Sequence, residues 1–196
     1  MNKQQEFLLT MLKEIHDICT RHDIKYALIG GTLIGAVRNG GFLPWDDDAD
    51  IAMPYEDYLR FAEVCEEETP PNRMLISPTI DENYRKVIPR WMSTDTTDIH
   101  TASSLHDDIA GELIDIFVLD PIGDSDESWR NYTYNLHLYN SIVNYSNANG
   151  ARFEVDPEEY RHYLALSKSK GQAYVNNLLE QRMVDGFDQN GHDYAE

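Results

Sequence analysis

The chain of 196 residues contains only two cysteines, Cys19 and Cys65, and no Cys-x-x-Cys pair. Small secreted domains usually depend on several paired cysteines. We therefore expect both thiols to be buried and reduced. The chain also lacks an apolar run of the roughly 20 residues that a spanning helix requires, and its N-terminus has no basic stretch followed by an apolar block. These absences predict no transmembrane segment and a cytoplasmic location.

Basic residues are scarce as well. The 16 lysines and arginines stand against 35 aspartates and glutamates, so the formal net charge is −19. Such a chain repels nucleic acids and anionic membrane surfaces unless cations intervene. We therefore expect no nucleic acid partner, whereas a small phosphate ester held through a metal ion is compatible with the charge. The composition, with 41% apolar residues, is ordinary for a globular protein, and we expect one folded unit.

Several common functional motifs are also missing. The seven histidines show no His-Glu-x-x-His or other ligand spacing, and no serine stands in a Gly-x-Ser-x-Gly setting. An EF-hand loop starting at Asp46 fails because its sixth position is Ile51 and not glycine. A Walker loop starting at Gly30 fails because Ala36 and Val37 stand where lysine and serine or threonine are required. The sequence thus gives no support to these four classes of site.

The spacing of apolar residues predicts helices towards both ends of the chain and strands between them. Helices are expected over residues 4–21, 33–38, 54–68, 127–147 and 157–184. Strands are expected over residues 26–29, 48–53, 74–77, 87–92 and 113–119. This order predicts an α+β fold, with a mixed sheet and flanking helices in a core over residues 1–124. A helical C-terminal portion over residues 125–196 is expected to pack on that core.

An acidic cluster attracts attention, because four aspartates fall within residues 46–50. Successive side chains of a strand alternate between its faces, so Asp48 and Asp50 are expected to project from one face. Two adjacent carboxylates disfavour joint ionisation unless a cation lies between them. A solvated acidic loop is the alternative interpretation. The close flanking of the cluster by Trp45 and Ile51 favours a metal site.

A further carboxylate, Asp115, lies in the middle of a predicted apolar strand, where a lone charge costs several kcal/mol and therefore needs a partner. If that strand lies beside Asp48 and Asp50, the three side chains form one carboxylate cluster. Mg²⁺ suits such a cluster because it accepts one or two carboxylates and fills its other positions with water and phosphate oxygens. Two ions about 4 Å apart would brace the attacking and leaving oxygens of a phosphoryl displacement.

The glycine-rich run before the cluster supplies features of a phosphate site. Gly30 and Gly31 let a backbone approach a phosphate closely, and the amides that open a helix capped by Thr32 can face an anion. A plain tight turn is the alternative for these glycines. Arg38 either binds a phosphate or ends its helix favourably near the carbonyls. Trp45 stacks on a base, holds a quaternary ammonium group by cation–π attraction, or packs in the core.

Three segments together resemble a known family: GGTLIGAVR at residues 30–38, GFLPWDDDADI at 41–51 and IDIF at 114–117. They closely resemble the LicD family of the nucleotidyltransferase-fold superfamily, to which fukutin-related proteins are related. The resemblance implies a nucleotidyltransferase-like mixed-sheet catalytic domain that requires Mg²⁺. It also implies transfer of a phospho-alcohol, such as phosphocholine, from a CDP-linked donor to a carbohydrate or glycolipid hydroxyl, with release of CMP.

The resemblance further implies roles for particular residues. The metal ligands and catalytic carboxylates are Asp48, Asp50 and Asp115, of which Asp115 also serves as the base. Gly31 and Thr32 match the turn that binds the donor phosphate, and Arg38 matches the arginine that closes the glycine block. Gly30 and Trp45 are further substrate-binding candidates, on the grounds given above. Family members are usually longer, with an additional C-terminal segment rich in tyrosine and glycine, so the chain is expected to be trimmed or to be a short member.

Other functions stay open at this point. An enzyme of the same fold can transfer a nucleotidyl group from an NTP to a small-molecule hydroxyl and release pyrophosphate. A non-catalytic acidic domain that binds metal or a partner is motivated by the net charge of −19. Lys86 and Arg90 are either donor ligands or members of surface ion pairs. The tyrosines of the predicted C-terminal helices either line an acceptor groove or, as we expect, pack in a core.

Overall fold

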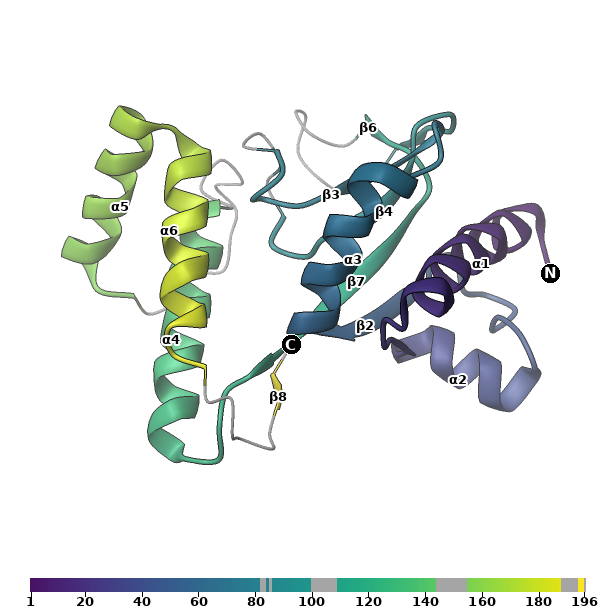
Figure 1. Cartoon of the computed structure of the whole chain (residues 1–196), viewed down its shortest axis with the longest axis horizontal. Helices are drawn as coiled ribbons and strands as arrows, with labels where there is room; N and C mark the ends of the chain where they lie inside the picture. The colour runs from purple at the N-terminus through teal and green to yellow at the C-terminus, as the bar shows by residue number, and fades with distance from the viewer. Residues whose placement is uncertain (82–83, 85, 100–108, 144–154, 188–193, 196) are drawn as a thin grey trace. The chain divides into compact units, whose positions relative to one another are not determined.

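The computed structural model describes residues 1–81, 84, 86–99, 109–143, 155–187 and 194–195 (Figure 1). The chain divides into two compact units, one of residues 1–75 and 88–119, and one of residues 76–87 and 120–196. Helices and a mixed sheet occur together in the chain, so the α+β class predicted from the sequence is confirmed.

The main sheet has the strand order β1-β2-β7-β4-β3, and β8 pairs with the end of β7. Its strands are β1 (Ala27–Leu28), β2 (Asp50–Pro54), β3 (Arg73–Ile76), β4 (Arg90–Ser93), β7 (Leu113–Pro121) and β8 (Tyr194–Ala195). β2 runs parallel to β7, whereas β1 is antiparallel to β2 and β4 is antiparallel to β7. A separate two-stranded sheet joins β5 (Asp98–Ile99) and β6 (Ile109–Ala110). β7 is therefore the central strand of the first unit.

The first unit contains the helices α1 (Lys3–His22), α2 (Gly30–Asn39) and α3 (Tyr55–Glu68). A capping box begins α1: the Asn2 side chain accepts from the Gln5 amide, and the Gln5 side chain accepts from the Asn2 amide. Pro54 precedes α3, which agrees with the prediction of a helix that starts at a proline. These helices lie within a few residues of the ranges predicted from the apolar spacing.

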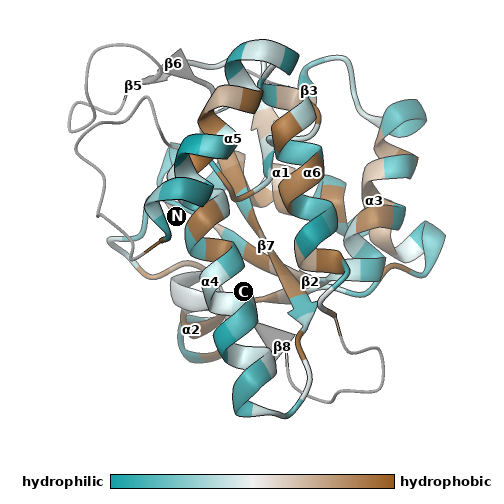
Figure 2. Ribbon diagram, turned by 90° about the vertical axis from the view of Figure 1, so that its left-hand side faces the viewer, coloured by the Kyte–Doolittle hydropathy of each residue, from teal (hydrophilic) through white to brown (hydrophobic). Residues whose placement is uncertain are grey.

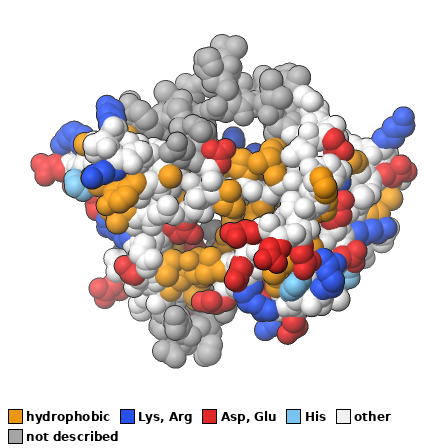
Figure 3. Space-filling view, turned by 45° about the horizontal axis from the view of Figure 1, so that its top comes forward, with side chains coloured by type: hydrophobic (Ala, Val, Ile, Leu, Met, Phe, Trp, Pro, Cys, Tyr) orange, Lys and Arg blue, Asp and Glu red, His pale blue; other side chains and the backbone are white. Residues whose placement is uncertain are grey.

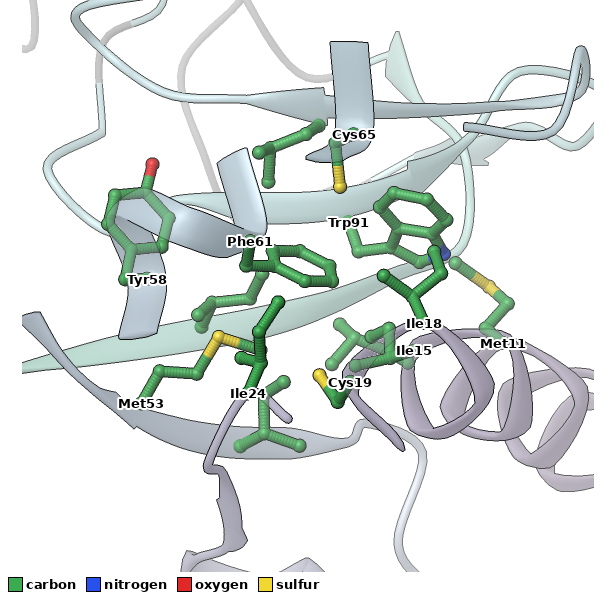
Figure 4. Packing of buried hydrophobic residues seen from close by; sticks show 14 of the residues in the cluster. Met11, Ile15, Ile18, Cys19, Ile24, Met53, Tyr58, Phe61, Cys65 and Trp91 are labelled. Atoms are coloured by element: carbon green, nitrogen blue, oxygen red, sulfur yellow. The ribbon is translucent and has the colours of Figure 1, made fainter. Parts of the chain in front are cut away.

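Helices α1 and α3 bury their apolar side chains against one face of the sheet (Figure 4). Trp91 of β4 packs against Phe61 of α3, with ring centroids 5.9 Å apart. Ile51 of β2 and Ile116 of β7 are fully buried in the same cluster. Figure 2 shows the corresponding hydrophobic colouring along β7. Because strand side chains alternate, the residues next to these isoleucines lie on the opposite face of the sheet.

Both cysteines lie in this core as free thiols, as the sequence predicted. Burial raises the pKa of Cys19 to about 12, and the charge of Asp57 contributes to the rise. Burial likewise raises the pKa of Cys65 to about 12. Thiols that stay protonated at neutral pH are poor nucleophiles, so these cysteines contribute packing and no chemistry.

The second unit is built on the helices α4 (Asp126–Val143), α5 (Pro157–Lys170) and α6 (Gln172–Val184). The single helix predicted over 157–184 is wrong, because Gly171 has a φ of +94° and separates α5 from α6. The helix predicted over 127–147 is present as far as Val143, and residues 144–147 lie outside the described part. None of the helices in the described ranges is long and apolar enough to cross a bilayer.

Most aromatic residues of these helices pack in the core of the second unit, as expected from the sequence. Tyr132, Tyr139 and Tyr163 are buried there, whereas Trp129 is 45% exposed. Tyr145 lies outside the described residues. Several acidic side chains lie side by side on the face shown in Figure 3, which agrees with the net charge of −19.

Candidate active site

Three charged side chains form one row across the sheet of the first unit. The parallel register of β2 and β7 pairs Asp50 with Asp115, and the antiparallel register of β4 and β7 pairs Asp115 with Arg90. The row lies on the face opposite the core, because Ile51 and Ile116 follow directly along their strands and are buried. The fold thus brings carboxylates from two distant segments of the sequence onto neighbouring strands.

Asp48 lies just before this row. The predicted strand start at position 48 is wrong, because β2 begins at Asp50 and the preceding aspartates occupy an irregular segment. Asp48 is exposed, and Asp50 is half-buried. Within the described ranges, no three histidine, cysteine, aspartate or glutamate side chains are arranged as a preformed metal site. Among the described residues, a cation bound here would therefore have fewer than three such ligands in place.

Burial and, after it, mutual repulsion raise the pKa values of two aspartates in the cluster. Burial, followed by the charges of Asp48, Asp115 and Asp46, raises the pKa of Asp50 to about 6. Partial burial raises the pKa of Asp48, to which the charges of Asp46 and Asp47 contribute next. Both shifts disfavour the ionised carboxylates in the absence of a cationic partner. A hard divalent cation is the partner that such oxygen atoms favour.

Gly30 and Gly31 bring the first turn of α2 against the carboxylates. A Cβ atom at Gly30 would lie 3.2 Å from Oδ2 of Asp50, and one at Gly31 would lie 2.7 Å from Oδ2 of Asp46. Gly30 also has a φ of +54°, in the left-handed region that favours glycine. The glycines therefore leave room for the two carboxylates beside the positive end of the helix.

Thr32 does not cap this helix, so the predicted cap is wrong. The N-cap residue of α2 is Ile29, and no side chain caps the helix. Thr32 is buried, and its Oγ1 atom accepts a hydrogen bond of 2.9 Å from the backbone N–H of Asp50. The Ile29 N–H donates to the carbonyl of Asp50 at 3.3 Å. Thr32 thus fixes the start of β2 and leaves the first amides of α2 without a side-chain cap.

Gln5 positions the acidic segment from α1. Its Nε2 atom donates to the carbonyl oxygens of Leu43 and Asp46 at 2.9 and 2.8 Å, and only 3% of the residue is exposed. The sequence interpretation missed this residue. The sequence did contain a signal for it: Gln5 lies three residues before Leu8, on the apolar face of α1. A glutamine on such a face is buried and therefore needs hydrogen-bond partners in the protein.

Asp46 is another residue that the sequence interpretation did not single out from the acidic cluster. Its Oδ2 atom is buried and has no hydrogen-bond partner among the described residues. A buried carboxylate oxygen without a partner is costly unless a cation or a water molecule satisfies it. This orphaned atom supports a cation-binding interpretation of the segment.

Arg90 forms an ion pair, which was one of its two predicted interpretations. Its Nε atom donates to Oδ1 of Asp115 at 2.6 Å, and the two side chains are 20% and 23% exposed. Asp115 therefore has the partner that a carboxylate in an apolar strand was expected to need.

Two predicted substrate residues, Arg38 and Trp45, are both exposed. Arg38 lies in the last turn of α2, about 12 Å along the helix axis from Gly30. Its phosphate-binding role stays a prediction. Trp45 is 71% exposed, so the alternative that it packs in the core is wrong. Its role in substrate binding also stays a prediction.

Comparisons with known proteins concern the same part of the chain. Residues 23–110 match the family model described as LicD/FKTN/FKRP, nucleotidyltransferase domain. The chain is 48% identical over 69 residues to the lipopolysaccharide cholinephosphotransferase LicD of Haemophilus influenzae, a match that covers 35% of this chain and 26% of that protein.

Two uncharacterized proteins also match, at 42% identity in Rickettsia typhi and 40% in Rickettsia prowazekii, each over 57 residues and 29% of this chain. These matches cover 18% and 21% of the two rickettsial proteins. The chain therefore aligns with only about a quarter or less of each of these curated relatives. No solved structure matches the chain.

Proposed function

We propose that the chain is a phosphocholine-type transferase, because residues 23–110 match the LicD/FKTN/FKRP nucleotidyltransferase domain model. In this proposal a phospho-alcohol moves from a CDP-linked donor to a hydroxyl of a carbohydrate or glycolipid, and CMP is released. The name of the H. influenzae relative supports phosphocholine as the group and a lipopolysaccharide-like acceptor. One observation carries the proposal: Asp50 and Asp115 lie opposite each other on neighbouring strands, and Gly30, at the start of α2, lies against Asp50.

Asp48 and Asp50 are the residues that would hold Mg²⁺. Their hard carboxylate oxygens, the raised pKa values and the orphaned Oδ2 atom of Asp46 all fit a cation of this class. When bound, the ion would neutralise negative charge that develops on the donor phosphates. Two carboxylates are enough for Mg²⁺, which usually keeps water or phosphate oxygens in its remaining positions.

The first turn of α2 supplies the groups that would bind the donor phosphate. The helix has no side-chain cap, so the amides of Gly30, Gly31 and Thr32 are available at its positive end. Gly30 and Gly31 also present no side chain that would keep a phosphate from the backbone. Trp45, which is exposed and directly precedes the aspartates in the sequence, would hold a quaternary ammonium group by cation–π attraction.

Asp115 would act as the general base. Its Oδ1 atom accepts from Arg90, which leaves Oδ2 to take the proton of the acceptor hydroxyl. The hydroxyl oxygen then attacks the phosphorus, the bond from phosphorus to the CMP oxygen breaks, and CMP departs with that electron pair. A cytoplasmic location belongs to the same proposal, since the free thiols of Cys19 and Cys65 fit a reducing compartment.

The test is CMP release from a panel of CDP-linked alcohols, with and without Mg²⁺. We expect release to depend on Mg²⁺ and the Asp48→Asn variant to lose at least about 100-fold in rate, because the charge of a metal ligand is removed. The matched control is Asp47→Asn, an exposed neighbour with the same change of charge. A parent-like rate for Asp48→Asn would exclude the metal-binding role.

The same assay separates the other two functions. Pyrophosphate released from an NTP, with no CMP from the CDP-alcohols, would favour nucleotidyl transfer. Calorimetry that shows cation binding without nucleotide affinity would favour a non-catalytic acidic domain. Either result would overturn the proposed phospho-alcohol transfer.

A further inference from the structure

Of the carboxylates in the site, Asp115 has a basic side chain as its partner, and Asp48 and Asp50 differ from it in this respect. Arg90 and Asp115 are directly opposed in the register of β4 and β7, so the backbone fixes both ends of their ion pair. Both side chains are largely buried, and a charge-assisted hydrogen bond in such a place is stronger than an exposed one. The strand register therefore holds Arg90 and Asp115 in position to pair.

Asp48 and Asp50 have no comparable partner. Within the described part of the chain, no lysine, arginine or histidine is shown in an ion pair with either of them or with Asp46. The same ranges contain no three-ligand metal site. The cluster therefore separates into a compensated carboxylate, Asp115, and an uncompensated pair.

We infer that the Arg90 guanidinium takes the place of a second cation at Asp115, so that the site loads a single divalent ion on Asp48 and Asp50. This inference rests on the proposed function and replaces the two ions expected from the sequence. One divalent ion balances two carboxylates, and Arg90 balances the third. A second ion at Asp115 would lie within a few ångströms of the guanidinium, where like charges repel strongly. Arg90 is thus a positioning residue that acts through Asp115.

Metal stoichiometry tests this inference without any need for turnover. The full chain is titrated with Mn²⁺, alone and with CMP, and the free Mn²⁺ is measured by electron paramagnetic resonance. We expect the parent to bind one Mn²⁺ per chain and the Asp50→Asn variant to bind it at least about tenfold more weakly. The Arg90→Gln variant is expected to bind two Mn²⁺, because Asp115 then has no cationic partner.

Two controls accompany the titration. Arg90→Lys keeps a positive charge at the position and is expected to bind one Mn²⁺. Arg60→Gln removes an exposed arginine that pairs with Asp57 elsewhere in the same unit, and it is also expected to bind one Mn²⁺. Circular dichroism on each variant confirms that it is folded before its stoichiometry is compared.

The outcomes distinguish this inference from the proposed function. Two Mn²⁺ on the parent, or one on a folded Arg90→Gln variant, would overturn the single-ion site while the transferase proposal stands. A parent that binds no Mn²⁺, with or without CMP, would overturn the single-ion site and the metal dependence of the proposed function together.

Discussion

At the residue scale, small and uncharged side chains shape the site as much as the aspartates do. Gly30 and Gly31 leave space for the carboxylates of Asp50 and Asp46, and Thr32 holds the backbone of Asp50. Alternation along a strand was enough to predict which face Asp50 occupies. The contact between Gly31 and Asp46 was not predictable in this way, because it depends on how the loop before β2 folds back onto α2.

Gly31→Ala tests this close contact. The new Cβ atom would lie 2.7 Å from Oδ2 of Asp46, so the carboxylate must move. We expect CMP release to fall about 10- to 100-fold, as displacements of about 1 Å do in other active sites. The control is Gly41→Ala, where nothing lies within 4 Å of the added atom. Equal rates for the two variants would show that the contact has no functional importance.

At the element scale, α1 serves the site as well as the core. Its apolar face covers the sheet, and its first turn holds the acidic segment through Gln5. The spacing of apolar residues predicted this helix and α3 well, since both bury one continuous face. It did not predict the break at Gly171, where the backbone adopts a φ of +94°, nor β5, β6 and β8, which have two residues each and carry no periodicity.

Gln5→Leu tests the support that α1 gives to the acidic segment. Leucine fits the apolar face but leaves the carbonyl oxygens of Leu43 and Asp46 without their donor. We expect the free energy of unfolding in urea to fall by about 1–3 kcal/mol and CMP release to fall with it. Gln4→Ala, which removes an exposed hydrogen bond to the Asp47 carbonyl and a long, partly buried one to Glu112, is the control and should lower stability by less than Gln5→Leu does. A fully stable and active Gln5→Leu variant would contradict this role.

At the scale of the whole molecule, a buried carboxyl group links stability to pH. Asp120 of the second unit is 8% exposed and accepts a hydrogen bond of 2.8 Å from the hydroxyl of Tyr132. Burial raises the pKa of Asp120 to about 7; the Tyr132 hydrogen bond opposes this rise, and the nearby charge of Glu180 adds to it. Between about pH 4 and pH 7 the folded chain therefore binds a proton that the unfolded chain has released. The free energy of unfolding must fall as pH rises through this window.

Asp120→Asn tests this linkage. The amide keeps an acceptor for Tyr132 and cannot ionise, so the variant should match the parent below about pH 4 and exceed its stability at pH 8 by on the order of 4 kcal/mol. Urea unfolding followed by circular dichroism at both pH values measures the difference. Asp47→Asn, the same change at an exposed position, should follow the parent at both. Parallel pH profiles for the parent and Asp120→Asn would show that the buried group is not responsible.

The row of Asp50, Asp115 and Arg90 lies on one face of the sheet, and the hydrophobic core lies on the other. Asp50→Asn therefore removes a carboxylate of the site and leaves both the hydrophobic core and the ion pair between Asp115 and Arg90 in place. A chain with this one substitution can serve as an inert decoy, which makes it a suitable bait for capturing the natural acceptor from cell extracts.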